Sequence, residues 1–277
     1  MAFLQVNFVS KTLMRTVTIN AILPVDKFSL DPNAVRVDKP FKTLYLLHGL
    51  LGNYTDWVNG TRVQRWAEAK DLAVIMPSGE NGFYVDSPAQ PWNRYGQFVG
   101  EELVEITRRM FPLSHKREDT FIGGLSMGGF GAIRNGLKYH ETFGSIVGLS
   151  NAIHILEEGS QHMDTAYEEG CFGPFAAARE SDKNPRWLIE KLAAEKKADP
   201  VLALPRVFMA CGTEDGLLGV NRVYRDLFRE KGFDLTYYES AGGHTWDFWD
   251  QYIEKAINEW LPLDEGKAGM NSGNVSG

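Results

Sequence analysis

The sequence predicts an α/β protein with a mainly parallel central sheet and helices on both of its faces. Short, continuous apolar runs recur along the chain, as expected for parallel strands that are covered on both sides. Segments with apolar residues at helical spacing alternate with these runs, which is the order of β-α-β units. The chain has 277 residues, of which 43% are hydrophobic, and this is enough to bury the core of one large α/β domain.

The N-terminal part differs because it alternates apolar and polar residues with a period of two. This pattern covers residues 4–9 and 14–23 and indicates antiparallel strands at one edge of the sheet. Residues 24–40 are rich in Pro, Asp and Lys and are expected to form a loop. The continuous apolar runs then predict parallel strands at residues 43–47, 73–76, 120–122, 145–149 and 207–210.

Helices are expected at residues 62–70, 99–110 and 249–260, because apolar side chains in each segment fall on one helical face. Residues 151–200 interrupt the alternation and are interpreted as a small cap or lid insertion over the carboxyl edge of the sheet. We therefore expect one domain over residues 1–263. Residues 264–277, rich in Gly, Ser and Asn, are expected to be a disordered tail.

Charge and cysteine usage limit the classes of partner and compartment. The formal net charge is −7, whereas nucleic acids and anionic membranes would require a basic face. No apolar run approaches the roughly 20 residues of a membrane helix, and the N-terminus does not resemble a signal peptide, so we expect a cytoplasmic protein. Cys171 and Cys211 form no metal-type cluster, and a disulfide between them is compatible with the sequence but not implied. The sequence leaves homo-oligomer formation open.

The most informative motif is a G-x-S-x-G pentapeptide around Ser126, with the sequence G-L-S-M-G at residues 124–128. It lies between a strand-like run at residues 121–125 and a helical segment at residues 129–139. A serine on such a sharp strand-to-helix turn is a nucleophile elbow, and glycines are needed there because side chains would collide with the neighbouring strand and helix. The motif alone is also compatible with a glycine-rich packing turn, so the other positions have to decide.

A serine hydroxyl needs a base, and the base needs an acid that orients it. Asp215 follows the apolar run at residues 207–210 and is the candidate acid; the adjacent Glu214 is the competitor, and the shorter side chain favours Asp215. His244 follows two glycines between a strand-like run at residues 235–239 and the final helix, and it is the candidate base. The order of serine, acid and histidine is that of α/β-hydrolases.

Two backbone amides are expected to form an oxyanion hole. One is the N–H of Met127, directly after the serine, and the other is the N–H of Leu50 in the loop H-G-L-L-G that follows the strand at residues 43–47. The alternative for this loop is an ordinary strand-ending turn. Each element is weak alone, and the ordered set is much more specific than any part of it.

On these residues the chain resembles the esterase D family of α/β-hydrolases, which includes S-formylglutathione hydrolases and tributyrin-type, acetyl and feruloyl esterases. It looks most similar to the bacterial tributyrin esterase branch. The matching pieces are Leu46-Leu47-His48-Gly49, Trp57, the run from Lys116 to Gly129, the run from Cys211 to Asp215 and the run from Gly243 to Trp249. The resemblance implies the α/β-hydrolase fold, a triad of Ser126, Asp215 and His244, an oxyanion hole from Leu50 and Met127, and no metal or organic cofactor.

The expected function is a serine carboxylesterase for a small-molecule ester with a short acyl or a hydroxycinnamoyl (feruloyl-type) group. Trp246, near His244, and Trp92 are candidate substrate-binding residues, because an aromatic pocket suits either group. The loop after Gly49 lacks the cysteine that S-formylglutathione hydrolases often carry there, which weakens glutathione thioester hydrolysis as the alternative. A sugar acetyl esterase or acyltransferase stays open. A non-catalytic binding protein is disfavoured because the triad region is intact.

Overall fold

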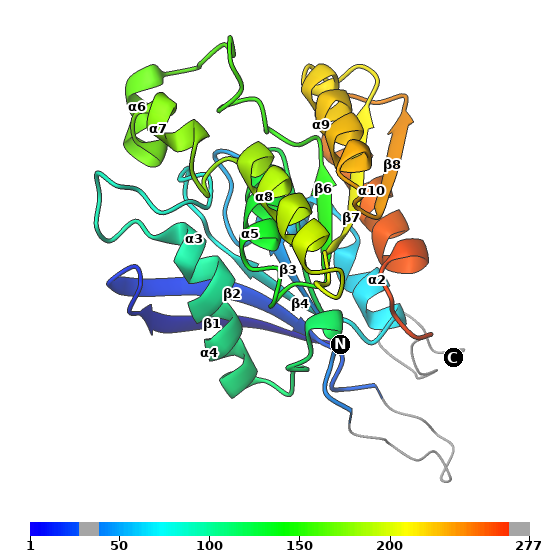
Figure 1. The fold of residues 1–277 in the computed structure, drawn as a ribbon. Helices are drawn as coiled ribbons and strands as arrows, with labels where there is room; N and C mark the ends of the chain where they lie inside the picture. Colours follow the sequence, from blue (N-terminus) through cyan, green and yellow to red (C-terminus); the bar gives the residue numbers. More distant parts are fainter. Residues whose placement is uncertain (28–38, 266–277) are drawn as a thin grey trace.

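Six of the eight strands of the central sheet are parallel in the computed structural model, which describes residues 1–27 and 39–265 (Figure 1). The strand order is β1-β2-β4-β3-β5-β6-β7-β8, with β1 and β2 antiparallel at one edge. The strands are β1 (Ala2–Ser10), β2 (Arg15–Leu23), β3 (Thr43–Leu47), β4 (Ala73–Pro77), β5 (Thr120–Leu125), β6 (Ser145–Leu149), β7 (Arg206–Gly212) and β8 (Leu235–Ser240). This confirms the expected α/β fold and its antiparallel edge.

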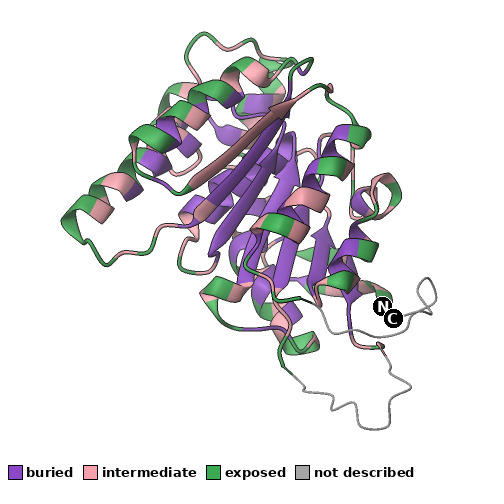
Figure 2. Ribbon diagram, turned by 90° about the vertical axis from the view of Figure 1, so that its right-hand side faces the viewer, coloured by how far each residue is buried: buried purple, intermediate pink, exposed green. Residues whose placement is uncertain are grey.

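Helices cover both faces of the sheet, and the inner strands are buried between them (Figure 2). One face carries α3 (Tyr95–Gln97), the π-helical η1 (Phe98–Glu102), α4 (Leu103–Met110), α5 (Met127–Lys138), α8 (Pro185–Ala198) and α9 (Leu218–Glu230). The other carries α1 (Asp56–Gly60), α2 (Val63–Ala69), α10 (Trp246–Lys255) and the π-helical η3 (Ala256–Trp260). A short 3₁₀ turn, η2 (Arg117–Asp119), leads into β5.

Alternate side chains of the inner strands fill two separate cores, one on each face of the sheet. In β3, Tyr45 and Leu47 belong to the core under α4 and α5, whereas Leu44 and Leu46 belong to the core under α2 and α10. Successive side chains of a strand point to opposite faces of the sheet, so a strand that is buried on both faces needs apolar side chains along its whole length. This explains why these strands are continuous apolar runs in the sequence.

The insertion after β6 has two parts with different roles in the fold. α6 (Thr165–Phe172) and α7 (Phe175–Arg179) lie beyond the carboxyl ends of the strands (Figure 1). By contrast, α8 packs on α5 and buries Leu188, Ile189 and Leu192 in the main core. The second half of the segment that the sequence assigned to a cap is therefore part of the helical layer.

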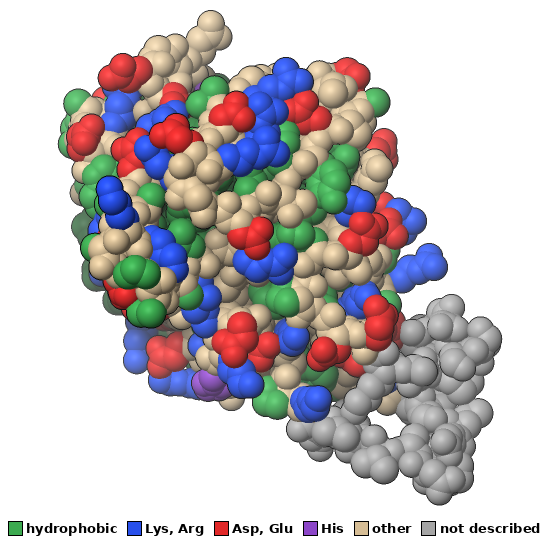
Figure 3. All heavy atoms as spheres, turned by 45° about the vertical axis from the view of Figure 1, so that its right-hand side comes forward, with side chains coloured by type: hydrophobic (Ala, Val, Ile, Leu, Met, Phe, Trp, Pro, Cys, Tyr) green, Lys and Arg blue, Asp and Glu red, His purple; other side chains and the backbone are tan. Residues whose placement is uncertain are grey.

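Some expectations fall partly or wholly outside the described residues: the loop at 24–40 is described only at its ends, and the tail only as far as residue 265. Within the described residues, no helix is long and apolar enough to cross a membrane. Cys171 and Cys211 are both free thiols. Charged side chains of both signs lie interspersed on the face drawn in Figure 3.

Candidate active site

Ser126 lies at the junction of β5 and α5 with a backbone conformation that non-glycine residues rarely adopt. Its φ and ψ are 54° and −119°. This conformation is held from the neighbouring strand, because Ser126 N–H donates to the carbonyl of Leu149 (2.9 Å) and its own carbonyl accepts from Ala152 N–H (3.0 Å). A strained residue persists only where its surroundings determine it, and strain of this kind is concentrated at functional sites.

The glycines of the motif let the strand and the helix approach each other. A Cβ on Gly128 would lie 2.3 Å from the carbonyl oxygen of Leu47, and one on Gly124 would lie 2.3 Å from the carbonyl oxygen of Gly128. Both contacts are with backbone atoms, so any side chain would push α5 off the sheet. Met127 is the first residue of α5, and its N–H is therefore one of the amides that a helix leaves without an internal partner.

Asp215 and His244 form a hydrogen-bonded pair at the carboxyl ends of β7 and β8. The Oδ2 atom of Asp215 lies 2.9 Å from Nδ1 of His244, and Oδ1 accepts from Leu217 N–H at 2.9 Å. Burial raises the pKa of Asp215, but the hydrogen bonds from His244, Leu217 and Ser150 outweigh it, and the pKa lies below its usual value. The ionised carboxylate holds the proton of the imidazole on Nδ1, which leaves Nε2 free to accept another proton.

The structure distinguishes Asp215 from its neighbour Glu214. The Asp215 side chain is 1% exposed and faces His244, whose side chain is 38% exposed. The Glu214 carboxylate instead accepts from the N–H of Gly242 and from the hydroxyl of Thr213, so it closes the loop that carries His244. The acid chosen from the sequence is the one that contacts the histidine.

Ser150 and Trp249 complete the support of this pair, and sequence reasoning missed both. The Trp249 ring lies edge-on to the His244 ring at 4.9 Å between centroids, and its Nε1 donates to Ser150 Oγ at 3.1 Å. Ser150 in turn hydrogen-bonds Asp215. The sequence does contain a signal for Ser150, because a polar residue directly after a buried apolar strand lies at the edge of the sheet where the other site residues are.

The loop after β3 lies against the nucleophile turn. A Cβ on Gly49 would be 3.5 Å from Cβ of Ser126, so the backbone of the loop passes close to the serine. The His48 ring organises this loop. Its Nε2 accepts from Gly79 N–H at 2.8 Å, so Nδ1 carries the proton and donates to the carbonyl of Gly49 at 2.6 Å.

That hydrogen bond fixes the direction of the amide that the sequence predicts as an oxyanion donor. The C=O and N–H of a trans peptide point in opposite directions, so a Gly49 carbonyl turned toward His48 leaves Leu50 N–H pointing away from it. Burial lowers the pKa of His48, against weaker opposing effects of Gly49 and nearby carboxylates, and keeps the ring neutral as this arrangement requires. The Tyr84 hydroxyl donates to the His48 carbonyl at 3.1 Å.

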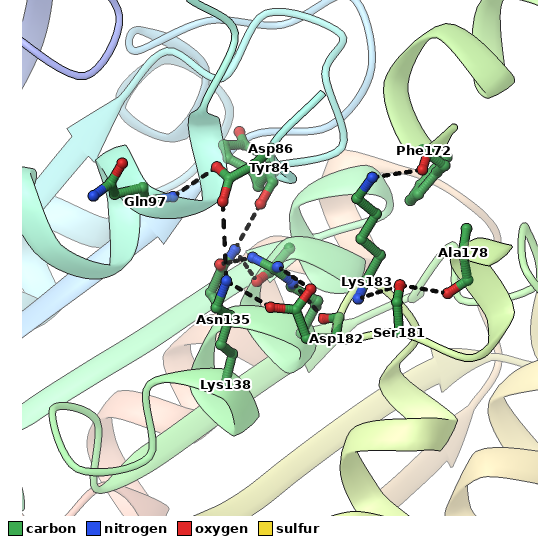
Figure 4. Close-up of polar contacts among 12 residues, drawn as sticks. Tyr84, Asp86, Gln97, Asn135, Lys138, Phe172, Ala178, Ser181, Asp182 and Lys183 are labelled. Carbon is green, nitrogen blue, oxygen red and sulfur yellow. Dashed lines mark hydrogen bonds and ion pairs between the residues drawn. The ribbon is translucent and has the colours of Figure 1, made fainter. Parts of the chain in front are cut away.

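Tyr84 is tied to the helix that follows the serine. Asn135 on α5 donates to the Tyr84 carbonyl at 3.0 Å (Figure 4). The same cluster reaches the segment between α7 and α8, because the buried Arg134 and the partly exposed Lys138 both contact Asp182. Helix α5, the loop that supports the oxyanion amide and the cap are thus held as one polar network.

A pocket of about 540 Å³ opens beside the loop after β3 and the segments that follow β6 and β7. Its wall includes Leu50, Ala152, which donates to the Ser126 carbonyl, and Leu217, two residues after Asp215. Trp246 and Trp92 do not line it: the Trp246 ring packs over Gly60 and edge-on to Trp57, and Trp92 is 58% exposed in a loop. The ring of Trp246 thus lies against α1, and a role of Trp246 and Trp92 in binding the substrate stays a prediction.

A strained serine between a buried strand and a helix, next to a histidine–carboxylate pair on a mostly parallel sheet, defines a serine hydrolase of the α/β-hydrolase fold. The chain belongs to the esterase family whose model is described as putative esterase, and this model matches residues 10–259.

Known proteins agree with this assignment. An acetyl esterase of Caldicellulosiruptor saccharolyticus is 43% identical over 272 residues, covering 94% of this chain and 98% of the relative. Among solved structures, fluorophosphonate-binding serine hydrolase F of Staphylococcus aureus matches with a TM-score of 0.80 at 28% identity, covering 94% of this chain and 98% of the other. An S-formylglutathione hydrolase from the same organism matches with a TM-score of 0.79 at 28% identity and the same coverage.

Proposed function

We propose that this esterase hydrolyses esters of short acyl groups, acetyl foremost, through an acyl-enzyme on Ser126. The observation that carries the proposal is the hydrogen bond between buried Asp215 and His244 at the same edge of the sheet as the strained serine. The Asp215 carboxylate holds the His244 imidazole in the tautomer of a general base, and the turn at residue 126 presents the serine hydroxyl whose proton the base removes.

In the proposed mechanism His244 Nε2 removes the proton from Ser126 Oγ as the oxygen attacks the ester carbonyl. The amides of Leu50 and Met127 stabilise the oxyanion, and the imidazolium then donates its proton to the departing alkoxide. Water repeats the sequence on the acyl-enzyme: His244 takes its proton, the carboxylic acid leaves and Ser126 Oγ recovers the proton.

The acyl preference rests on relatives and on the chemistry of the pocket. The acetyl esterase matches nearly the whole chain, whereas an S-formylglutathione hydrolase of Paracoccus denitrificans matches 41% of it at 31% identity. Glutathione carries two carboxylates, and the residues lining the pocket include Glu168 but neither Lys nor Arg. A hydroxycinnamoyl group is the second candidate, because Leu50, Leu217 and Val220 give the pocket a partly exposed apolar wall against which its ring could pack.

Two measurements test the proposal. A fluorophosphonate should label the native protein on Ser126 and fail to label Ser126→Ala, because only an activated serine reacts. Values of kcat/KM for acetyl, butyryl and feruloyl esters and for S-formylglutathione should rank acetyl first. Absence of labelling contradicts the mechanism, whereas labelling with a preference for feruloyl ester or thioester contradicts only the acyl assignment.

A further inference from the structure

The loop after β4 connects the loop that carries Leu50 to the cap. Residues 78–84, here termed the bridging loop, contact both the turn after β3 and helix α6. Glu80, Phe83 and Tyr84 of this loop have φ values of 49°, 52° and 55°, in the left-handed region that non-glycine residues rarely adopt. Such strain persists only where the surroundings determine the backbone, so the neighbouring elements hold this loop in one conformation.

Asn81, in the middle of the bridging loop, holds the peptide that follows Leu50. Its Oδ1 accepts from the N–H of Leu51 at 2.8 Å. Leu51 has a φ of 66° and occupies the third position of a turn that is closed by Gly52 N–H and the Gly49 carbonyl at 3.3 Å. Glycine or asparagine adopts this conformation at little cost, whereas leucine does not. The Leu51 side chain is 89% exposed, so the bond to Asn81, and not side-chain packing, holds the conformation.

Leu50 thus lies between two peptides that each have an anchor of their own. His48 holds the peptide before it through the Gly49 carbonyl, and Asn81 holds the peptide after it through the Leu51 N–H. Two fixed peptide planes also fix φ and ψ of the residue between them, because these are the only soft backbone dihedrals of a residue. The direction of the Leu50 amide therefore depends on Asn81 as well as on His48.

The main chain of Asn81 is in turn held by the cap. The hydroxyl of Tyr167 on α6 donates to the Asn81 carbonyl, and Sγ of Cys171, one turn further along the helix, lies 4.0 Å from the same oxygen. Burial raises the pKa of Tyr167, so the hydroxyl keeps the proton that it donates. The ring of Phe83 packs on that of Phe172 at the end of α6, with 5.1 Å between centroids. Helix α6 therefore helps to determine where the bridging loop lies.

We propose that Asn81 is a positioning residue of this esterase, which transmits the contact between the cap and the bridging loop to the oxyanion amide of Leu50. The inference rests on the proposed acyl-enzyme at Ser126, because only a developing oxyanion makes the direction of that amide matter. Among the described residues, neither Asn81 nor Tyr167 lines the pocket, so both act through the backbone and not by touching the substrate. Loss of the cap contact should therefore loosen the oxyanion hole without altering the pocket wall.

The test measures kcat and KM for a chromogenic acetate, together with the urea-unfolding midpoint of each variant. Asn81→Ala should lower kcat about 10-fold with KM within about twofold, which is less than the loss of a whole donor because His48 still holds one peptide. Water can replace the acceptor at the exposed Leu51 N–H, so the unfolding midpoint should stay near the native value. Asn59→Ala is the matched control, because this asparagine is exposed on α1 and its variant should keep the native kcat.

Two further variants separate positioning from a merely structural role. Leu51→Gly, added to Asn81→Ala, should recover most of the lost kcat, because glycine keeps the left-handed conformation without the lost bond. Tyr167→Phe should lower kcat about threefold, and added to Asn81→Ala it should lower kcat no further, since residues that act through one contact are not additive.

Kinetic values of Asn81→Ala within about twofold of native overturn the proposal, and so does a loss of kcat that Leu51→Gly does not recover. Tyr167→Phe removes one oxygen from a partly exposed side chain, so it tests the cap contact even if Asn81→Ala does not fold. A native kcat in Tyr167→Phe, or a loss that adds to that of Asn81→Ala, overturns the proposed link to the cap. Fluorophosphonate labelling of Ser126 in the native protein keeps all of these outcomes apart from failure of the proposed function, which the absence of that labelling would show.

Discussion

Replacement of His48 by alanine tests whether a neutral histidine holds the oxyanion amide in place. The native ring accepts from Gly79 N–H at 2.8 Å and donates to the Gly49 carbonyl at 2.6 Å. His48→Ala removes both bonds, which leaves the Gly49 carbonyl with only the longer bond from Gly52 N–H (3.3 Å), so that the Gly49–Leu50 peptide turns more easily, and leaves the Gly79 amide without this partner.

The two lost bonds have separable consequences. Loss of one oxyanion donor lowers kcat by about 10²- to 10³-fold in serine hydrolysis, so we expect a drop of roughly 10²-fold with little change in KM. The unpaired amide should lower the free energy of unfolding by about 1–3 kcal/mol. Both effects follow from a side chain that does not itself contact the substrate.

The assay is kcat for a chromogenic acetate at saturation, combined with urea unfolding of the same preparations. Ile257→Val is the matched control, because this fully buried residue lies on η3 and should lose about 0.5–1.5 kcal/mol of stability without changing kcat. If His48→Ala loses stability as expected but keeps kcat within about twofold of the native value, the proposed positioning role is wrong.

Three further predictions concern the same site. Asp215→Asn should lower kcat by roughly 10³- to 10⁴-fold because the imidazole loses its tautomer, whereas Glu214→Gln should keep kcat within about 10-fold; equal losses would contradict the assignment of the acid. The folded pKa values of His48 and His154 lie below the unfolded value of 6.5, so the unfolded chain binds more protons and stability should fall as pH falls below about 6.5. Urea unfolding at pH 7 and pH 5.5 measures this, and His48→Gln should show a smaller difference than the native chain. Gly128→Ala should lose both folding stability and activity, since its Cβ would lie 2.3 Å from a backbone oxygen; an active variant with native thermal stability would show that α5 can shift.

Much of the fold and the order of the site residues could be predicted because each depends on local sequence. A strand that is buried on both faces must be apolar throughout, so β3 and β5 are visible as runs. The carboxyl ends of parallel strands share one edge, so Asp215 after β7 and a serine after β5 were expected near each other.

The remaining features depend on contacts between residues far apart in the chain. His48 gains its role from Gly79, which no spacing rule connects to it. The contact between His162 and Glu168 forms only because the segment before α6 folds back toward that helix. The position of Trp246 next to His244 in sequence does not show what its ring contacts, which is Trp57 of α1 and Trp249 of α10.

The central claim is that Ser126 becomes acylated during turnover. Acid quenching of the enzyme during hydrolysis of an acetyl ester, followed by proteolysis and mass spectrometry, measures this directly. We predict an acetyl group on the peptide that contains Ser126 of the native enzyme and none on Ser126→Ala. The acetylated fraction should be larger in His48→Ala or Asp215→Asn if the substitution slows deacylation more than acylation. An acetyl group on another residue, or ester hydrolysis at the native rate by Ser126→Ala, would contradict the account.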